Sequence, residues 1–183
     1  MRKVIAALNT TLDGICDHTA GVPDGEIHEH YTKLLNDGGV ILYGRTTYQL
    51  MEYWRTLVES PSEEKSMNDF ANAINEIPKI VFSRTLKSVD WYNTTLARRD
   101  LAEEVLELKN QSGNDIFIGS RSLIIQLMNL DLIDEYQLCI HPVVAGSGSP
   151  LFENVKDRTI LKLINTKIFG GGAVILYYER NSK

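Results

Sequence analysis

Residues 115–152 read DIFIGSRSLIIQLMNLDLIDEYQLCIHPVVAGSGSPLF, and this stretch decides the predicted fold. It opens on a short apolar run at 116–118, which is typical of a buried strand. Gly119-Ser120 follow, and then comes a pattern that places one apolar stripe on a helix. A second strand is predicted from Tyr136 to Val144. The apolar helix positions are Leu123, Ile124, Leu127 and Met128. The stretch therefore predicts a strand–helix–strand unit whose helix begins at a glycine turn.

The turn at Gly119-Ser120 favours an anion. Backbone N–H groups and the helix dipole converge at a bare helix N-terminus, and this combination suits a phosphate group. Two roles are open to Ser120, because its hydroxyl can cap the helix or donate a hydrogen bond to a phosphate oxygen. Glycine also occurs in many tight turns that bind nothing, since it simply fits the bend. One such turn is a weak signal, and further turns of the same kind strengthen it.

Two more apolar runs end in residues that suit phosphate. Val40 to Tyr43 runs into Gly44-Arg45-Thr46-Thr47, and Lys79 to Phe82 runs into Ser83-Arg84-Thr85. Ligands of open α/β sheets bind beyond the carboxyl ends of the strands, so we expect the three turns to share one sheet edge and to grip a dinucleotide. The alternative is that a threonine only caps the second helix and that Arg45 is solvated. The spacing is not the GxGxxG fingerprint.

Bulk composition limits the class of protein. The chain has 183 residues, and we expect one domain spanning 1–183. Its 43% hydrophobic and 23% charged residues are ordinary for a soluble globular protein. A net charge of −5 argues against a general nucleic-acid or anionic-membrane surface. The start, MRKVIAALNTTLDG, is interpreted as a first strand and not as a signal peptide. Cys16 and Cys139 form no metal-ligand pattern, so we expect reduced thiols and a cytoplasmic protein.

Local signals predict further helices. One runs from Glu26 to Asn36, after an irregular loop that follows the first strand. Ser66 is expected to open another helix with Asp69 as its capping-box partner. Asp100 is expected to cap a third, with Glu103 three residues later.

The histidines do not predict a metal site. His28 and His30 are two residues apart and so lie on different helix faces, whereas a helical metal pair needs a spacing of three or four. We expect both to be solvated beside a ligand cleft. His141 alternates along a strand and is interpreted as structural.

The ordered set of motifs resembles a known family. It is similar to the dihydrofolate reductase-like superfamily, and within it to the C-terminal reductase domain of bacterial riboflavin-biosynthesis deaminase–reductases and their small stand-alone relatives. The matching pieces are Leu12-Asp13-Gly14, residues 42–48, Val81-Phe82-Ser83-Arg84, Ile118-Gly119-Ser120, Asp134-Glu135, residues 142–148 and Leu151-Phe152. They cover nearly the whole chain. The resemblance implies a single-domain α/β fold with a mixed, mostly parallel sheet flanked by helices and an antiparallel C-terminal strand.

The resemblance also implies NADPH bound along the strand ends. Carried over by position, four groups of residues would surround it, from the phosphates to the nicotinamide. They are Gly44, Arg45, Thr46 and Thr47 at a phosphate; Ser83 and Arg84 towards the adenosine and its 2′-phosphate; Gly119, Ser120, Arg121 and Ser122 at the pyrophosphate; and Val144, Ala145 and Gly146 towards the nicotinamide half.

These implications lead to a reductase that transfers a hydride to a small heterocyclic or carbonyl-like substrate. Its rivals are a non-catalytic nucleotide-binding protein that kept the fold and a substrate-binding module that no longer uses NADPH. Reduction of a C=N or C=O bond also needs a proton. The available acids are Asp13, Glu26 and Glu29, and Asp13 is placed best because its loop leaves a core strand. The alternative, to which we give equal weight, is that Asp13 only shapes the turn before Gly14.

The last part of the chain predicts a homodimer. Thr159 to Phe169 and Ala173 to Tyr178 are read as two strands of an antiparallel hairpin around Gly170-Gly171-Gly172. The apolar region from Ile160 to Tyr178 offers more strand surface than one small sheet needs to cover. The resemblance points the same way, and homodimers are the commonest oligomers.

Overall fold

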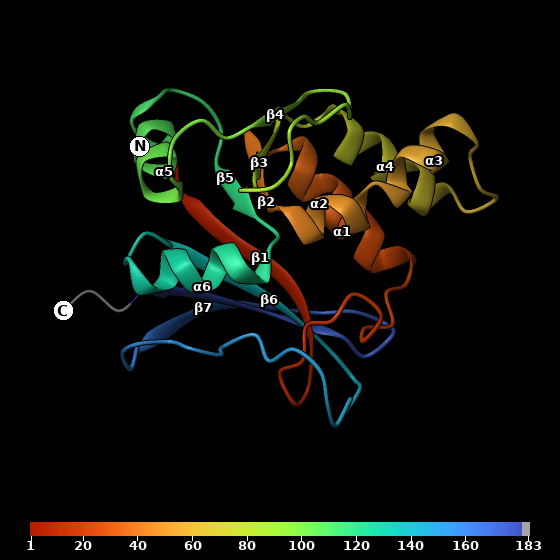
Figure 1. The fold of residues 1–183 in the computed structure, drawn as a ribbon. Coiled ribbons are helices and arrows are strands. Elements are labelled where there is room, and N and C mark those ends of the chain that lie inside the picture. The colour runs from red at the N-terminus through yellow and green to blue at the C-terminus, as the bar shows by residue number, and fades with distance from the viewer. Residues whose placement is uncertain (181–183) are drawn as a thin grey trace.

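Strand β1 (Val4–Thr11) lies inside an eight-stranded sheet and pairs in parallel with a neighbour on each side. The computed structural model describes residues 1–180. The strand order is β4-β3-β2-β5-β1-β6-β8-β7 (Figure 1). The other strands are β2 (Val40–Gly44), β3 (Lys79–Phe82), β4 (Thr94–Leu96), β5 (Ile116–Ile118), β6 (Glu135–His141), β7 (Leu161–Ile168) and β8 (Val174–Arg180).

The sheet is parallel from β4 to β6 and antiparallel beyond β6. β8 lies between β6 and β7 and runs antiparallel to both. The predicted closing hairpin is therefore confirmed, and its second strand is the one that joins the rest of the sheet. The predicted fold class, an α/β domain with a mixed, mostly parallel sheet and antiparallel strands at the C-terminal end, is confirmed as well.

Helices cover both faces of the sheet. They are α1 (Gly25–Asn36), α2 (Arg45–Met51), α3 (Tyr53–Glu59), α4 (Lys65–Glu76), α5 (Leu101–Asn110) and α6 (Arg121–Asn129). Successive side chains of a strand point to opposite faces. Accordingly Ile116 and Ile118 pack with α5 and α6, whereas Phe117 packs on the other face with α1 and α4. Figure 1 shows α1 to α4 gathered on one side of the sheet. Within residues 1–180, no helix combines the length and the apolar character that a membrane span requires.

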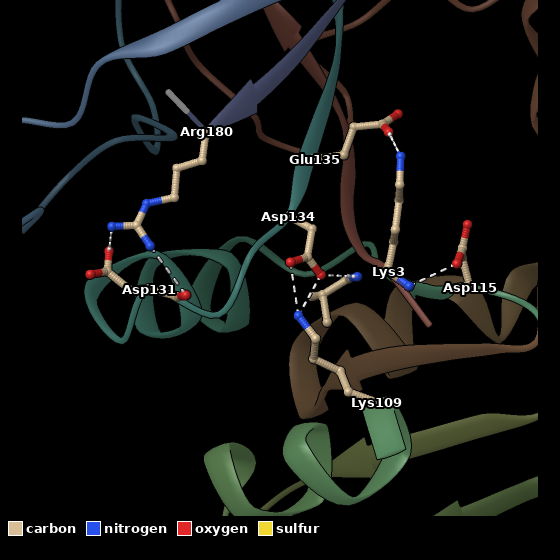
Figure 2. A network of polar contacts seen from close by, with 8 residues as sticks. Lys3, Lys109, Asp115, Asp131, Asp134, Glu135 and Arg180 are labelled. Atoms are coloured by element: carbon tan, nitrogen blue, oxygen red, sulfur yellow. Dashed lines mark hydrogen bonds and ion pairs between the residues drawn. The ribbon is translucent and has the colours of Figure 1, made fainter. Parts of the chain in front are cut away.

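A polar network holds the amino edge of the sheet (Figure 2). The carboxylate of Asp134 accepts the backbone N–H of Val4 at 2.8 Å and pairs with Lys109 Nζ at 2.6 Å. Lys3 joins the same edge, because its backbone N–H donates to Asp115 at 2.8 Å. The motif Asp134-Glu135, which contributed to the resemblance, therefore aligns β1, α5 and β6 at the end of the sheet opposite the predicted phosphate turns.

Two local predictions are corrected. The capping box of Ser66 and Asp69 is wrong, because α4 begins at Lys65 without a side-chain cap, and Asp69 instead pairs with Lys65 on the surface. The N-cap at Asp100 is confirmed, since its carboxylate accepts the backbone N–H of Glu103 at 2.9 Å.

The second strand predicted within residues 115–152 is shorter than expected. β6 ends at His141 and not at Val144. Pro142 follows directly, and a proline has no N–H to continue a strand ladder. The chain then forms a loop that runs beside the loop after β1, where Leu12 donates its backbone N–H to Val143 O at 2.8 Å. Two loops far apart in sequence thus meet at the carboxyl ends of β1 and β6 (Figure 1).

Candidate functional site

The three turns predicted to hold phosphate lie side by side. β3, β2 and β5 are adjacent and parallel, so their carboxyl ends reach the same sheet edge. Gly44 ends β2, Ser83 follows β3, and Gly119 follows β5. Arg45 Nη1 donates to Thr85 Oγ1 at 2.8 Å, and this hydrogen bond connects the turn after β2 to the turn after β3. The expectation that these turns share one edge is correct.

Ser120 connects two of these turns. Its side chain is fully buried, and its Oγ accepts the backbone N–H of Gly44 at 2.9 Å. Neither role predicted for its hydroxyl is therefore observed, because the hydroxyl does not cap α6 and does not face the solvent. Within residues 1–180, the backbone N–H groups of Arg121 and Ser122 have no recorded acceptor. The first turn of α6 thus presents free amide donors, which suit an anion.

The packing around Gly44 is tight. A Cβ added there would lie 3.2 Å from Ser122 Oγ, so a side chain at this position would require the serine to move by a few tenths of an ångström. Thr46 is exposed, whereas Thr47 lines the cavity described below. The two threonines therefore face different surroundings, and only Thr47 is placed to contact a bound ring.

The arginine and serine side chains predicted to bind the cofactor differ in how far they are free to contact a ligand. Arg84 is exposed at the edge. Arg121 donates from Nε to Pro150 O at 2.7 Å and also pairs with Glu153, so part of its guanidinium already holds the loop after β6. The Oγ of Ser83 accepts the backbone N–H groups of two residues that follow it and so closes its own turn. At this edge several side chains hold backbone in place, whereas Arg45 and Arg84 are both exposed cations, and Arg45 uses one of its nitrogens to bind Thr85.

Asp13 binds the loop that was expected near the nicotinamide. Its carboxylate accepts the backbone N–H of Ala145 at 3.1 Å and of Gly146 at 2.7 Å. The Thr11 hydroxyl, followed by these two amides, lowers the pKa of Asp13 to about 2. A carboxylate with both oxygens occupied and such a low pKa is a poor proton donor near neutral pH. Of the two roles left open for Asp13, the geometry favours the structural one. Val144, beside this clamp, is largely exposed.

A cavity of about 280 Å³ lies between the sheet and helices α1 to α4. Its floor is formed by the carboxyl halves of β1, β2 and β5, and Gly119 and Arg121 stand at its edge. Thr47, Gly119 and Arg121 belong to two of the three turns, those after β2 and β5, so these two turns adjoin the cavity. Five aromatic side chains of its wall are Tyr31, Tyr43, Trp54, Phe70 and Phe117.

The candidate acids lie outside this cavity. Among the described residues, Glu29 is exposed and is not part of the cavity wall. Glu26 accepts the backbone N–H of Gly170 at 2.8 Å and likewise does not reach the wall. The reason is helical geometry, because α1 turns Ile27 and Tyr31 inward, and Glu26 and Glu29 lie on other faces of the helix. The second catalytic candidate, Glu29, is therefore wrongly placed for proton transfer in this cavity.

The histidines are less solvated than predicted. His28 lines the cavity, and burial lowers its pKa, so the ring is neutral near pH 7. Burial, followed by the nearby Lys167 and Lys33, lowers the pKa of His30 to about 4. His141 is fully buried, and its Nδ1 accepts the backbone N–H of Val22 at 3.2 Å, which fits its structural interpretation. Within residues 1–180, no cluster of three or more potential metal ligands is found.

The aromatic wall was not predicted. Trp54 from α3 and Phe70 from α4 meet edge to face at 4.5 Å between ring centroids. In the sequence both fit an ordinary helix face that turns towards a core. No local pattern distinguishes a core face from a cavity wall, because the difference depends on how far α1 and α4 stand from the sheet.

Comparison with known proteins identifies the family. A family model described as the RibD C-terminal domain matches residues 2–176. The chain belongs to the RibD C-terminal domain family. The uncharacterized protein YyaP of Bacillus subtilis is 39% identical over 185 residues, covering 98% of this chain and 96% of its own. A second uncharacterized protein of that organism, YwjB, is 28% identical and covers 98% of each chain.

Solved structures agree with this RibD-type fold. A protein from Shewanella sp. PV-4 that is described as a riboflavin biosynthesis protein matches the whole of both chains, with a TM-score of 0.74 at 18% identity. A pyrimidine reductase-like protein from Corynebacterium diphtheriae matches all of this chain and 93% of its own, with a TM-score of 0.65 at 14% identity. At these identities the likeness concerns the fold alone. The resemblance inferred from the motifs is confirmed, and the family is of the reductase type.

Substitutions at Ser120 and Ser122 make a matched pair that tests whether Ser120 stabilises the carboxyl edge of the sheet. Ser120→Ala leaves the buried N–H of Gly44 without an acceptor, so we expect the free energy of unfolding to fall by about 1–3 kcal/mol. Ser122→Ala removes an exposed hydroxyl and should change it by less than about 0.5 kcal/mol. Urea denaturation of the two variants measures both values. Equal stability of the two variants would contradict the structural role of Ser120.

Asp13 should stay ionised in acid. Its folded pKa of about 2 lies below the value of 3.8 for an unperturbed aspartate, so its stabilisation of the loop is complete above pH 3.8 and is lost as pH falls towards 2. We expect the amide signal of Gly146 in NMR spectra to stay constant down to about pH 3. Asp13→Asn should speed amide exchange at Ala145 and Gly146, whereas Asp157→Asn, on the exposed surface, should not. A midpoint near the ordinary aspartate pKa would show that the clamp is not formed in solution.

Proposed function

We propose that this protein is a cytoplasmic, NADPH-dependent reductase that transfers a hydride to a small heterocyclic or carbonyl-like substrate. One observation carries the proposal: three anion-suited turns stand side by side at one sheet edge, and two of them contribute residues to the wall of a mostly apolar cavity. Phosphates need donors and solvent, whereas a reacting ring pair needs a dry, shaped space. The family is consistent with this arrangement, since its members typically use a nicotinamide cofactor.

The residues at the edge fit the phosphates of such a cofactor. The free amides of Arg121 and Ser122 begin α6, and among the described residues the first turn of this helix has no acidic residue of its own and no side-chain cap that would compete with phosphate. Arg84 is exposed beside them at the end of β3 and is available for a 2′-phosphate. When bound, the cofactor would supply the hydride.

The chain's own residues would position the rings and keep water out. The clamp from Asp13 to Ala145 and Gly146 holds the loop beside the cavity mouth. Asp13, Glu26 and Glu29 do not line the cavity, and Asp17 on its wall is occupied by the backbone N–H of Ser149, so we propose that the proton that completes reduction passes through a lining histidine or tyrosine or through water. His28 is one such group, and because burial lowers its pKa and leaves the ring neutral near pH 7, it would have to take up a proton before passing it on.

NADPH should bind more tightly than NADH. A guanidinium paired with a 2′-phosphate contributes about 1.5–3 kcal/mol, which corresponds to roughly a ten- to hundredfold difference in affinity. Arg84→Ala should remove most of this preference while leaving NADH affinity unchanged. Calorimetric titration of both cofactors against both proteins measures the effect.

A matched variant controls for loss of surface charge. Arg158 is also an exposed arginine but lies in the loop before β7, so Arg158→Ala should keep the wild-type preference. Equal affinity of the wild-type protein for the two cofactors would overturn the assignment of NADPH. Cofactor binding without oxidation of NADPH by any heterocyclic or carbonyl acceptor would favour the non-catalytic alternative.

We also propose that the protein is a homodimer. β7 is an edge strand of the sheet, and edge strands present unpaired backbone groups that proteins usually cover. Large apolar side chains are exposed along it and just before it, namely Ile160, Leu163, Ile164 and Ile168. A second copy of the same chain would cover both features.

Light scattering at micromolar concentration tests the dimer. We expect a mass of twice the 20.7 kDa of one chain. Ile168→Lys should shift the mass to that of one chain, because it buries a charge in the contact. Leu106→Lys, at an exposed leucine on α5, should leave the mass unchanged. A wild-type mass of 20.7 kDa would refute the dimer.

A further inference from the structure

The cavity contains almost no charge. Among the described residues of its wall, and leaving the histidines aside, only Asp17 and Arg121 carry a full charge at neutral pH. Both already bind protein groups. Asp17 accepts the backbone N–H of Ser149 at 3.0 Å, and Arg121 donates to Pro150 O and pairs with Glu153. Both charged groups therefore hold the loop after β6. Apart from the histidines, the rest of the wall has no cation that could pair with an acidic substrate.

The inner wall is instead flat and aromatic. Trp54 packs edge to face against Phe70, with 4.5 Å between the ring centroids, and against His28 at 5.7 Å. Phe117 contributes from the sheet floor. Since burial keeps His28 neutral near pH 7, this group of rings carries no charge there. Aromatic faces and edges of this kind pack well against another planar ring.

One neutral polar pair interrupts the apolar wall. Tyr31 donates its hydroxyl hydrogen to Asn9 Oδ1 at 3.0 Å, and both residues line the cavity. Within the described part of the chain, the amide nitrogen of Asn9 has no recorded acceptor. It is therefore a donor for a ring nitrogen or a carbonyl oxygen of a ligand, which gives orientation without requiring charge.

We propose that the cavity takes an uncharged, planar aromatic or heteroaromatic compound that carries no phosphate or carboxylate group. The inference deepens the proposed function and rests on it only for the role of this compound as the hydride acceptor. A cavity of about 280 Å³ is small for a binding site, so it suits a compact ring system and not an extended one. Phosphate chemistry is confined to the turns outside, where amides and Arg84 are available.

The physical reason is desolvation. An anion that enters an apolar cavity loses its hydration and is stable there only beside a cation or several donors. Neither is available on the inner wall, whereas a neutral ring gains by leaving water. A carboxylate added to a fitting ring should therefore weaken binding by at least about tenfold.

Quinoxaline and quinoxaline-6-carboxylate make a matched pair of probes. Both are flat bicyclic heteroaromatics and differ in one charged group. The chain has two tryptophans, so a ¹H–¹⁵N correlation spectrum shows two indole N–H signals. Trp54 lines the cavity, whereas the indole of Trp91 is buried elsewhere and donates to Asn75 Oδ1 at 2.9 Å. The signal that Trp54→Phe removes is assigned to Trp54.

Quinoxaline should shift the Trp54 signal and leave that of Trp91 in place, with or without NADPH. Its affinity should exceed that of the carboxylate by at least about tenfold. Equal or tighter binding of the carboxylate, or no shift of Trp54 by quinoxaline in either condition, would overturn the proposal. This readout needs no turnover. If quinoxaline binds in this way while NADPH does not bind at all, the cavity inference stands and the cofactor proposal fails.

A charge placed on the wall provides the reciprocal test. Leu50 lines the cavity on α2, and Leu50→Lys supplies the cation that the wall lacks. The ratio of the two affinities should move towards the carboxylate by about twofold to fivefold, because Leu50 is partly exposed and the new charge is screened. Leu106→Lys, outside the cavity, should leave the ratio unchanged. An unchanged ratio in Leu50→Lys would contradict the assigned wall.

Discussion

A single carboxylate joins three segments of chain at the amino edge of the sheet. Asp134 accepts the backbone N–H of Val4 and pairs with Lys109, so it connects the start of β1, the end of α5 and the approach to β6 (Figure 2). Lys109 is almost completely buried, and a buried charge without a partner is costly, which makes the contact selective for one alignment. β1 is in turn paired with β5 and β6. Because these strands are parallel, alignment of their amino ends also aligns the carboxyl ends at which the candidate site lies.

At the carboxyl edge, side chains hold backbone in place and leave backbone donors free. Ser120 accepts the amide of Gly44 instead of capping its own helix, and so the first amides of α6 stay available. Asp13 follows the same principle when it holds Ala145 and Gly146. Groups that look like ligand contacts in the sequence therefore act one step away, on the backbone that would meet the ligand. Contacts of this kind hold the backbone in place without a ligand, and a site formed in advance lowers the entropy that binding would cost.

Charge is divided sharply between the edge and the cavity. Arg84 and the helix amides stand in solvent, where an anion keeps part of its hydration. Inside, Trp54 and Phe70 face a neutral His28, and no free cation is present among the described residues of the wall. A dinucleotide would match this division, with its phosphates outside and one ring inside. An uncharged acceptor ring would complete the dry space, since hydride transfer benefits from close, water-free contact of the two rings.

Local sequence patterns were enough to predict the strands and the turns or helices that follow them. The apolar runs before Gly44, Ser83 and Gly119, each followed by a turn or a helix pattern, were sufficient to predict parallel strands whose carboxyl ends share one edge. Tertiary structure alone decided which groups remain free there. The hydroxyl of Ser120 and the carboxylate of Asp13 each had two uses that local sequence leaves open, and the choice depended on amides 76 and more than 130 residues away. The aromatic cavity was likewise beyond local patterns, because its existence depends on the spacing between helices and sheet, which only the packing of the whole chain sets.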